Sequence, residues 1–178
     1  IFPNGNSFDL SGQPGVDLTG MAGLKDKVNN PKSIDVQYSH GGLTGNYSHP
    51  IEVYESITLG IYSYEQQLAN AERIWQSRKS ENDAYYIIDS LDDLEKKWQI
   101  ILEGNPDFIK IFVRNSEVYE QRRNFIPKEW HRSDGGVNPK LVPIIVQKAH
   151  QAGLRVSIAN NSVQDFKLAV KSKADEIS

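Results

Sequence analysis

The chain has 178 residues, of which 38% are hydrophobic and 24% are charged, and its formal net charge is −3. These values are typical of one globular domain with a buried core, and the lack of a basic run leaves no electrostatic footprint for nucleic acid. No apolar stretch approaches the roughly 18 residues of a membrane span, and the lack of cysteine excludes disulfides and thiolate metal sites.

The first half of the chain predicts few regular elements. Residues 1–33 are rich in Gly, Pro, Asn and Asp, so we expect an irregular N-terminal segment before a structured region at 34–178. In chain order we then expect a strand at 34–38, a glycine-rich loop at 40–50, a helix at 64–78 and a short strand at 85–88.

The second half alternates strand and helix patterns. Ser90 and Asp93 have the spacing of a capping box before one helix, and Ser162 and Asp165 have it before another. Asn138-Pro139 is typical of a helix start. The expected elements are a helix ending at Gly104, a strand at 107–113, a short helix at 117–123, a helix from 138 to Gly153, a strand at 154–158, a helix with Val163, Phe166 and Val170 on its apolar face, and a strand beginning at 174.

This alternation predicts an α/β fold made of consecutive βα units, because such units build a parallel sheet. A complete (β/α)8 barrel takes about 250 residues, which is more than this chain has. We therefore expect part of a TIM-barrel-like parallel sheet.

Lys110 is the most unusual residue of the predicted strand at 107–113. Alternation places Phe108 and Phe112 on the same face as Lys110, and the other face is apolar as well. A strand apolar on both faces is typical of a helix-covered parallel sheet, where an unpaired ammonium is costly. Lys110 is therefore either functional or an edge-strand charge that blocks aggregation.

Several segments together resemble the amidohydrolase superfamily of metal-dependent hydrolases, which are built on a distorted (β/α)8 barrel. The matching pieces are Asp107-Phe108-Ile109-Lys110, Gly136-Val137-Asn138-Pro139, 149–157, 165–170 and Ala174-Asp175-Glu176-Ile177. The loop 41–45 with His49-Pro50 is similar to a loop in a bacterial branch of that family.

The resemblance implies hydrolysis of an amide or related C–N bond by water on one or two divalent metals, zinc or similar. It places Lys110 at the position of a carboxylated lysine that bridges the metals. A histidine ligand is expected after the strand at 154–158, where this chain has Ala159, and no His-x-His pair occurs. Because a catalytic metal normally needs three protein ligands, we expect an impaired or absent metal centre in this chain.

The remaining candidates for the site come from loops. His40 and His49 flank the glycine-rich loop, which we expect at the carboxyl end of a strand, so each has either a substrate-binding or a loop-stabilising role. Asn160 follows the predicted strand at 154–158, and its amide offers hydrogen bonds to a substrate but little metal affinity.

Three hypotheses remain. The chain is part of a metal-dependent amidohydrolase, a non-catalytic descendant that binds a small molecule in the former active site, or an assembly module whose open sheet edge is covered by a partner or a second copy.

Overall fold

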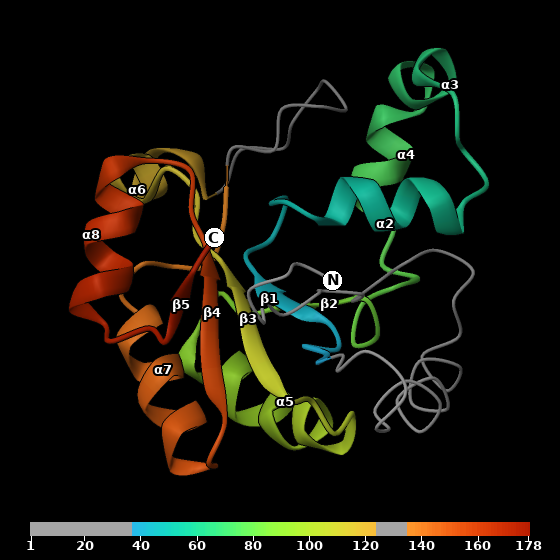
Figure 1. The fold of residues 1–178 in the computed structure, drawn as a ribbon. Helices are drawn as coiled ribbons and strands as arrows, with labels where there is room; N and C mark the ends of the chain where they lie inside the picture. Colours follow the sequence, from blue (N-terminus) through green and yellow to red (C-terminus); the bar gives the residue numbers. More distant parts are fainter. Residues whose placement is uncertain (1–36, 124–134) are drawn as a thin grey trace, which may run out of the picture.

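The computed structural model describes residues 37–123 and 135–178, and the irregular segment predicted at 1–33 lies outside them (Figure 1). Within this part of the chain, the strands are β1 (Gly42–Thr44), β2 (Tyr85–Ile87), β3 (Phe108–Phe112), β4 (Arg155–Ala159) and β5 (Glu176–Ile177). The helices are α2 (Ile51–Thr58), α3 (Tyr64–Ala69), α4 (Ala71–Gln76), α5 (Leu91–Glu103), the 3-10 turn η1 (Ser116–Val118), α6 (Tyr119–Arg122), α7 (Val142–Gln151) and α8 (Val163–Lys171). None of the described helices is long and apolar enough to cross a membrane.

The five strands form one parallel sheet in the order β2-β1-β3-β4-β5. Parallel strands joined by helices confirm the predicted α/β class, and the architecture is consistent with part of a TIM-barrel-like sheet. The order is not fully sequential, however, because β2 pairs on one side of β1 and β3 pairs on the other. The chain therefore changes direction across the sheet between β1 and β3.

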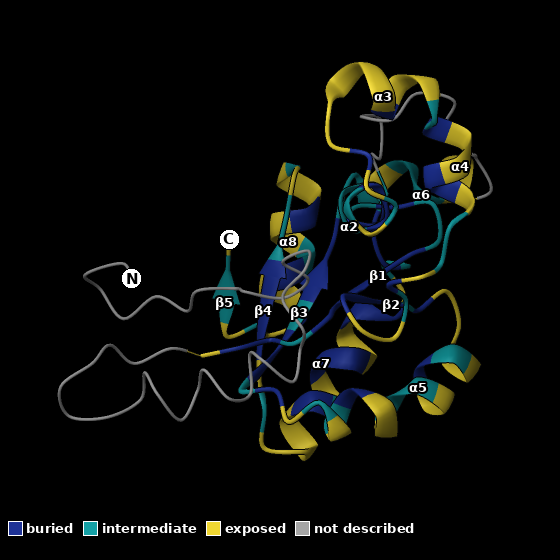
Figure 2. Cartoon of the chain, turned by 90° about the vertical axis from the view of Figure 1, so that its right-hand side faces the viewer, coloured by how far each residue is buried: buried dark blue, intermediate teal, exposed yellow. Residues whose placement is uncertain are grey.

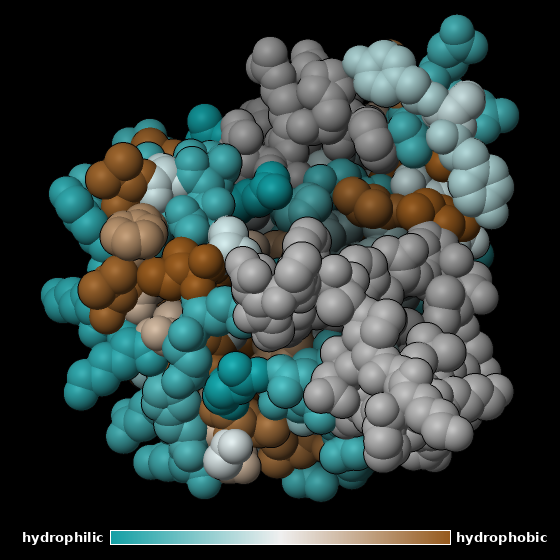
Figure 3. Space-filling view, viewed as in Figure 1, coloured by the Kyte–Doolittle hydropathy of each residue, from teal (hydrophilic) through white to brown (hydrophobic). Residues whose placement is uncertain are grey.

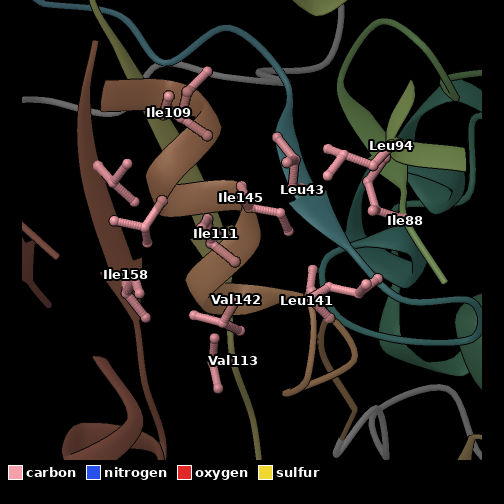
Figure 4. Packing of buried hydrophobic residues seen from close by; sticks show 14 of the residues in the cluster. Leu43, Ile88, Leu94, Ile109, Ile111, Val113, Leu141, Val142, Ile145 and Ile158 are labelled. Carbon is pink, nitrogen blue, oxygen red and sulfur yellow. The ribbon is translucent and has the colours of Figure 1, made fainter. Parts of the chain in front are cut away.

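Helices cover the two faces of the sheet unequally (Figures 1 and 2). The larger core lies between the sheet and α5, α7 and α8, and Figure 4 shows Ile145 of α7 beside Ile109, Ile111 and Leu43 of the strands. Tyr85 of β2 points away from this larger core and packs against Ile51 of α2 and Trp75 of α4. The alternation of neighbouring residues such as Tyr85 and Tyr86 between these two cores is that expected of a strand covered on both faces.

Residues 37–45 differ from the sequence prediction. Of the strand predicted at 34–38, residues 34–36 lie outside the described residues, and Gln37 and Tyr38 lie outside any strand. Gly42–Thr44, expected to be loop, forms β1. β1 is a strand because it pairs with β2 and β3, and these long-range partners are not visible in its three-residue sequence.

Three helices also differ from expectation. The predicted helix at 64–78 is divided into α3 and α4 at Asn70. α7 begins at Val142, because Asn138 instead opens a turn in which its carbonyl accepts the Leu141 N–H at 2.9 Å. Ser90 caps α5, but the Asp93 carboxylate accepts the Asp89 N–H, so the reciprocal half of a capping box is missing.

α8 has the predicted capping box but not the predicted buried face. Ser162 and Asp165 cap it reciprocally, whereas Val163, Phe166 and Val170 are 70%, 50% and 54% exposed. Figure 3 shows hydrophobic surface over α8, at the left of the view. The side of α8 that packs on the sheet is instead the side that carries Ala169, which is fully buried.

Candidate functional site

A cavity of about 310 Å³ opens at the carboxyl edge of the sheet. It is lined by Gly45–Ser48 after β1, by Asp89 after β2, by Arg114 and Asn115 after β3, and by Tyr119, 121–123 and 135–136. Ligands of open parallel sheets bind outside the carboxyl ends of the strands, at the point where the strand order reverses. The cavity lies between the segments that leave β1 and β3, which is that point.

Glycines allow the loops of this edge to approach closely. A Cβ on Gly45 would lie 2.4 Å from the Gly136 carbonyl oxygen, and a Cβ on Gly136 would lie 2.4 Å from the Phe112 carbonyl oxygen. Real Cβ atoms do not approach backbone this closely. The wall of the cavity therefore depends on the absence of side chains at Gly45 and Gly136.

Among the described residues, Arg114 is the cation of the cavity that has no partner in the protein. It lies two residues after Phe112, the last residue of β3, and is half-buried. In the described part of the chain, its guanidinium has neither a hydrogen-bond acceptor nor a carboxylate within ion-pair distance. Arg123, by contrast, pairs with Glu120 at 3.2 Å. A guanidinium that lines a cavity with its donors unused is available to a ligand.

Asp89 supplies a carboxyl group to the lining, and Tyr119 lines the cavity together with Tyr47. The protein packed around Asp89 raises the pKa of its carboxyl, and the Asn46 N–H, which donates to Oδ1 at 3.1 Å, partly opposes this shift. Burial and the nearby charge of Asp89 raise the pKa of Tyr119 to about 12. Tyr119 is therefore a neutral hydrogen-bonding group at physiological pH.

A buried carboxylate holds the segment after β3 in place. Asp165 of α8 is fully buried and accepts backbone N–H groups of Asn115 and Ser116 at 2.8 Å each, of Ser162 at 3.0 Å and of Asn161 at 3.2 Å. Burial alone would raise the pKa of Asp165, but these bonds and a side-chain bond to Ser116 outweigh it and lower the pKa. The residue next to Arg114 is thereby fixed to the start of α8.

Lys110 lies in the middle of β3, away from this cavity. It is half-buried between Phe108 and Phe112, and its ammonium lies 5.9 Å from the centre of the Phe112 ring. The register places Ser157 of β4 beside Lys110 and Glu176 of β5 beside Ser157. Its face of the sheet is therefore partly polar, with one carboxylate in the neighbouring strands.

Among the described residues, the side chains around Lys110 do not make up the ligand set of a catalytic metal. Within residues 37–123 and 135–178, no group of three or more His, Cys, Asp and Glu side chains could hold an ion. Ala159 pairs in register with Phe112 at the carboxyl end of β4, and its side chain has no atom that can bind a metal. The role of Lys110 as a metal ligand stays a prediction.

The two histidines are not brought together. Because Gly42–Thr44 is a strand, His40 lies at its amino end and His49 beyond its carboxyl end, so the prediction of a shared loop at the carboxyl edge is wrong for His40. Burial lowers the pKa of His40, whose ring lies 3.4 Å from the Tyr86 hydroxyl. His49 contacts Glu52 at 2.9 Å and packs edge-on against Phe112.

Asn160 lies at the carboxyl edge but outside the cavity lining. Its side-chain amide donates to the Ser178 carbonyl at 3.2 Å, and its backbone N–H donates to the same oxygen at 3.0 Å. The substrate-binding roles of His40, His49 and Asn160 stay predictions, and none of these residues lines the 310 Å³ cavity.

Sequence reasoning missed the residues that do line the cavity. Asp89 and Arg114 each follow a strand that was predicted correctly, so the rule that sites lie at the carboxyl ends of strands could have identified both. Tyr119 and Asn46 carry no such signal, since their positions depend on how the loops fold.

Comparison with known proteins supports the fold. No family model matches the chain, and no curated protein sequence matches it. Among solved structures, the fold is similar to that of ochratoxinase from A. niger, an amidohydrolase-family enzyme, with a TM-score of 0.55 and 14% sequence identity. The match covers 92% of this chain, which spans about a third (34%) of the ochratoxinase chain. The protein thus shares its fold with a part of the ochratoxinase structure.

Proposed function

We propose that this chain is a small-molecule-binding part of an amidohydrolase-like barrel, with its ligand in the cavity lined by Gly45–Ser48, Asp89, Arg114 and Tyr119. The observation that carries the proposal is the position of the cavity at the carboxyl edge, where the strand order reverses between β1 and β3. A volume of about 310 Å³ is that of a small organic molecule rather than a macromolecular surface.

Hydrolysis of an amide or related C–N bond is the chemistry implied by the resemblance to amidohydrolases. The similarity to ochratoxinase supports a hydrolase-like fold, and among the described residues the side chains around Lys110 do not make up the ligand set that such hydrolysis needs. Binding is therefore the function that the described residues support best. It corresponds to the non-catalytic alternative that the sequence left open.

The proposal is tested by ligand-observed NMR with a panel of neutral, cationic and anionic compounds of up to about 300 Å³. We expect some compounds to bind the full chain and to lose binding in Tyr119→Ala, which removes part of the cavity wall. Tyr64→Ala is the matched control, because Tyr64 is 55% exposed on α3 and does not line the cavity. Equal binding to both variants, or no binding to the parent chain, would contradict the proposal.

A further inference from the structure

We infer that the ligand of this cavity carries an oxyanion, either a carboxylate or a phosphate, and that Arg114 binds it. This inference rests on the proposed function and narrows the class of ligand. Arg114 lies two residues after the end of β3, and its backbone is tied to the sheet through Val113, whose N–H donates to the Ala159 carbonyl at 2.9 Å. The planar guanidinium presents a fixed fork of donors, so less entropy is lost for each hydrogen bond that it forms.

The polypeptide beside Arg114 is equally well fixed. Asn115 has a positive φ of 48° and donates its N–H to the buried Asp165 carboxylate, and Ser116 donates to the other oxygen of the same group. The Asp165 carboxylate accepts four backbone N–H groups and forms no ion pair with Arg114. The structure thus fixes the backbone that carries Arg114 at the cavity, and its guanidinium has no counter-charge within ion-pair distance in the described part of the chain.

The other charges of the lining are arranged differently. Arg123 is paired with Glu120, and Arg122 has interactions of its own, so neither is needed for the inference. Asp89 is the lining carboxylate on the β2 side of the cavity and does not lie within ion-pair distance of Arg114. An oxyanion is therefore attracted by Arg114 and repelled by Asp89. Removing the charge of Arg114 should weaken its binding, and removing the charge of Asp89 should strengthen it.

The experiment measures the affinity of three probes that share one ring, namely benzoate, phenyl phosphate and neutral benzamide, by isothermal titration calorimetry on the full chain. We expect an anionic probe to bind, with affinity reduced about tenfold or more in Arg114→Gln, since a charge-assisted hydrogen-bond pair is lost. Asp89→Asn keeps the oxygen that accepts the Asn46 N–H and should raise the affinity about two- to five-fold.

Arg73→Gln is the matched control, because it removes the same charge from an exposed site on α4 outside this cavity and should change nothing. Benzoate and phenyl phosphate separate the two sources of the oxyanion. If benzamide binds as well as the anions and Arg114→Gln has no effect, the inference is overturned while the proposed function stands. Weaker binding in both Arg114→Gln and Asp89→Asn would also overturn it. A chain that binds none of the three probes would overturn the inference, whereas the proposed function falls only if the wider compound panel also fails to bind.

Discussion

At the scale of single residues, Asp165 shows how one carboxylate can fix two loops. It joins the segment after β3 to the segment after β4 through four backbone N–H groups. In Asp165→Asn, the side-chain NH2 group would face backbone N–H groups, which need an acceptor. We expect the free energy of unfolding at pH 7 to fall by about 2–4 kcal/mol, measured by urea denaturation.

The pH dependence of this contribution has a definite sign. The pKa of Asp165 is lower in the folded chain, so its stabilisation is fully present above the unfolded pKa of about 4 and is lost as the pH falls through the folded pKa. In Asp165→Asn, the free energy of unfolding should fall less steeply between pH 5 and pH 2, because this contribution is missing. Asp92→Asn, an exposed carboxylate paired with Lys96, should retain it. Identical pH profiles for all three proteins would refute the assignment.

At the scale of elements, Glu55 attaches the helices α2 and α4 to the sheet. It is fully buried in α2 and accepts the Tyr85 hydroxyl at 2.7 Å, the Ser80 N–H at 2.8 Å, the Lys79 N–H at 3.2 Å and the Ser77 hydroxyl. Burial and the bond to Glu55 also raise the pKa of Tyr85. The Glu55 carboxylate therefore holds the segment between α4 and β2 in place.

We expect Glu55→Ala to cost about 3–5 kcal/mol of stability, because it leaves buried donors without an acceptor. Hydrogen exchange should rise first at the amides of residues 77–80. Glu72→Ala on the exposed side of α4 is the control and should change stability by less than about 0.5 kcal/mol. Unchanged exchange at 77–80 in Glu55→Ala would show that other contacts hold this segment.

On the exposed side of α8, by contrast, we expect substitutions to have little effect on stability. Replacing Val163, Phe166 and Val170 by Thr, Gln and Gln should change the free energy of unfolding by no more than about 1 kcal/mol, while reducing self-association measured by light scattering. Ala169→Leu, on the buried side of the same helix, should cost about 1–3 kcal/mol through overpacking. A large loss of stability in the polar variant would mean that this side is covered in the folded protein.

At the scale of the whole molecule, the metal content separates the binding and hydrolase hypotheses. We expect protein purified without chelator and supplied with bicarbonate to contain less than one equivalent of zinc, manganese or iron, because the described ligands do not gather around Lys110. Elemental mass spectrometry measures this directly. One equivalent of metal that disappears in Lys110→Met would restore the metal-dependent hydrolase hypothesis.

The sequence predicted those parts of the fold that depend on local pattern. The strand with Lys110 and the capped start of α8 were found because alternation and capping are encoded within a few residues. β1 was missed because three residues become a strand only through pairing with β2 and β3. Likewise, the periodicity of Val163, Phe166 and Val170 defines an apolar side of α8 but does not say whether anything packs on it.

The residues that line the cavity were not predicted from the sequence, and the roles of His40, His49 and Asn160 stay predictions. Those three residues have side chains suited to binding, whereas the lining of the cavity depends on where each strand ends. Arg114 and Asp89 are ordinary charged residues in the sequence, and only the parallel sheet places the ends of β2 and β3 on either side of Gly45.

The reversal of strand order between β1 and β3 has a consequence for how this fold can acquire new ligands. The sheet fixes the point where each bordering segment departs, but not its length or its side chains beyond that point. Residues 114–123 can therefore vary while the buried strands keep their sequence. A library confined to these positions, with Asp165 and Gly136 retained, would explore changes of ligand specificity separately from the requirements of folding.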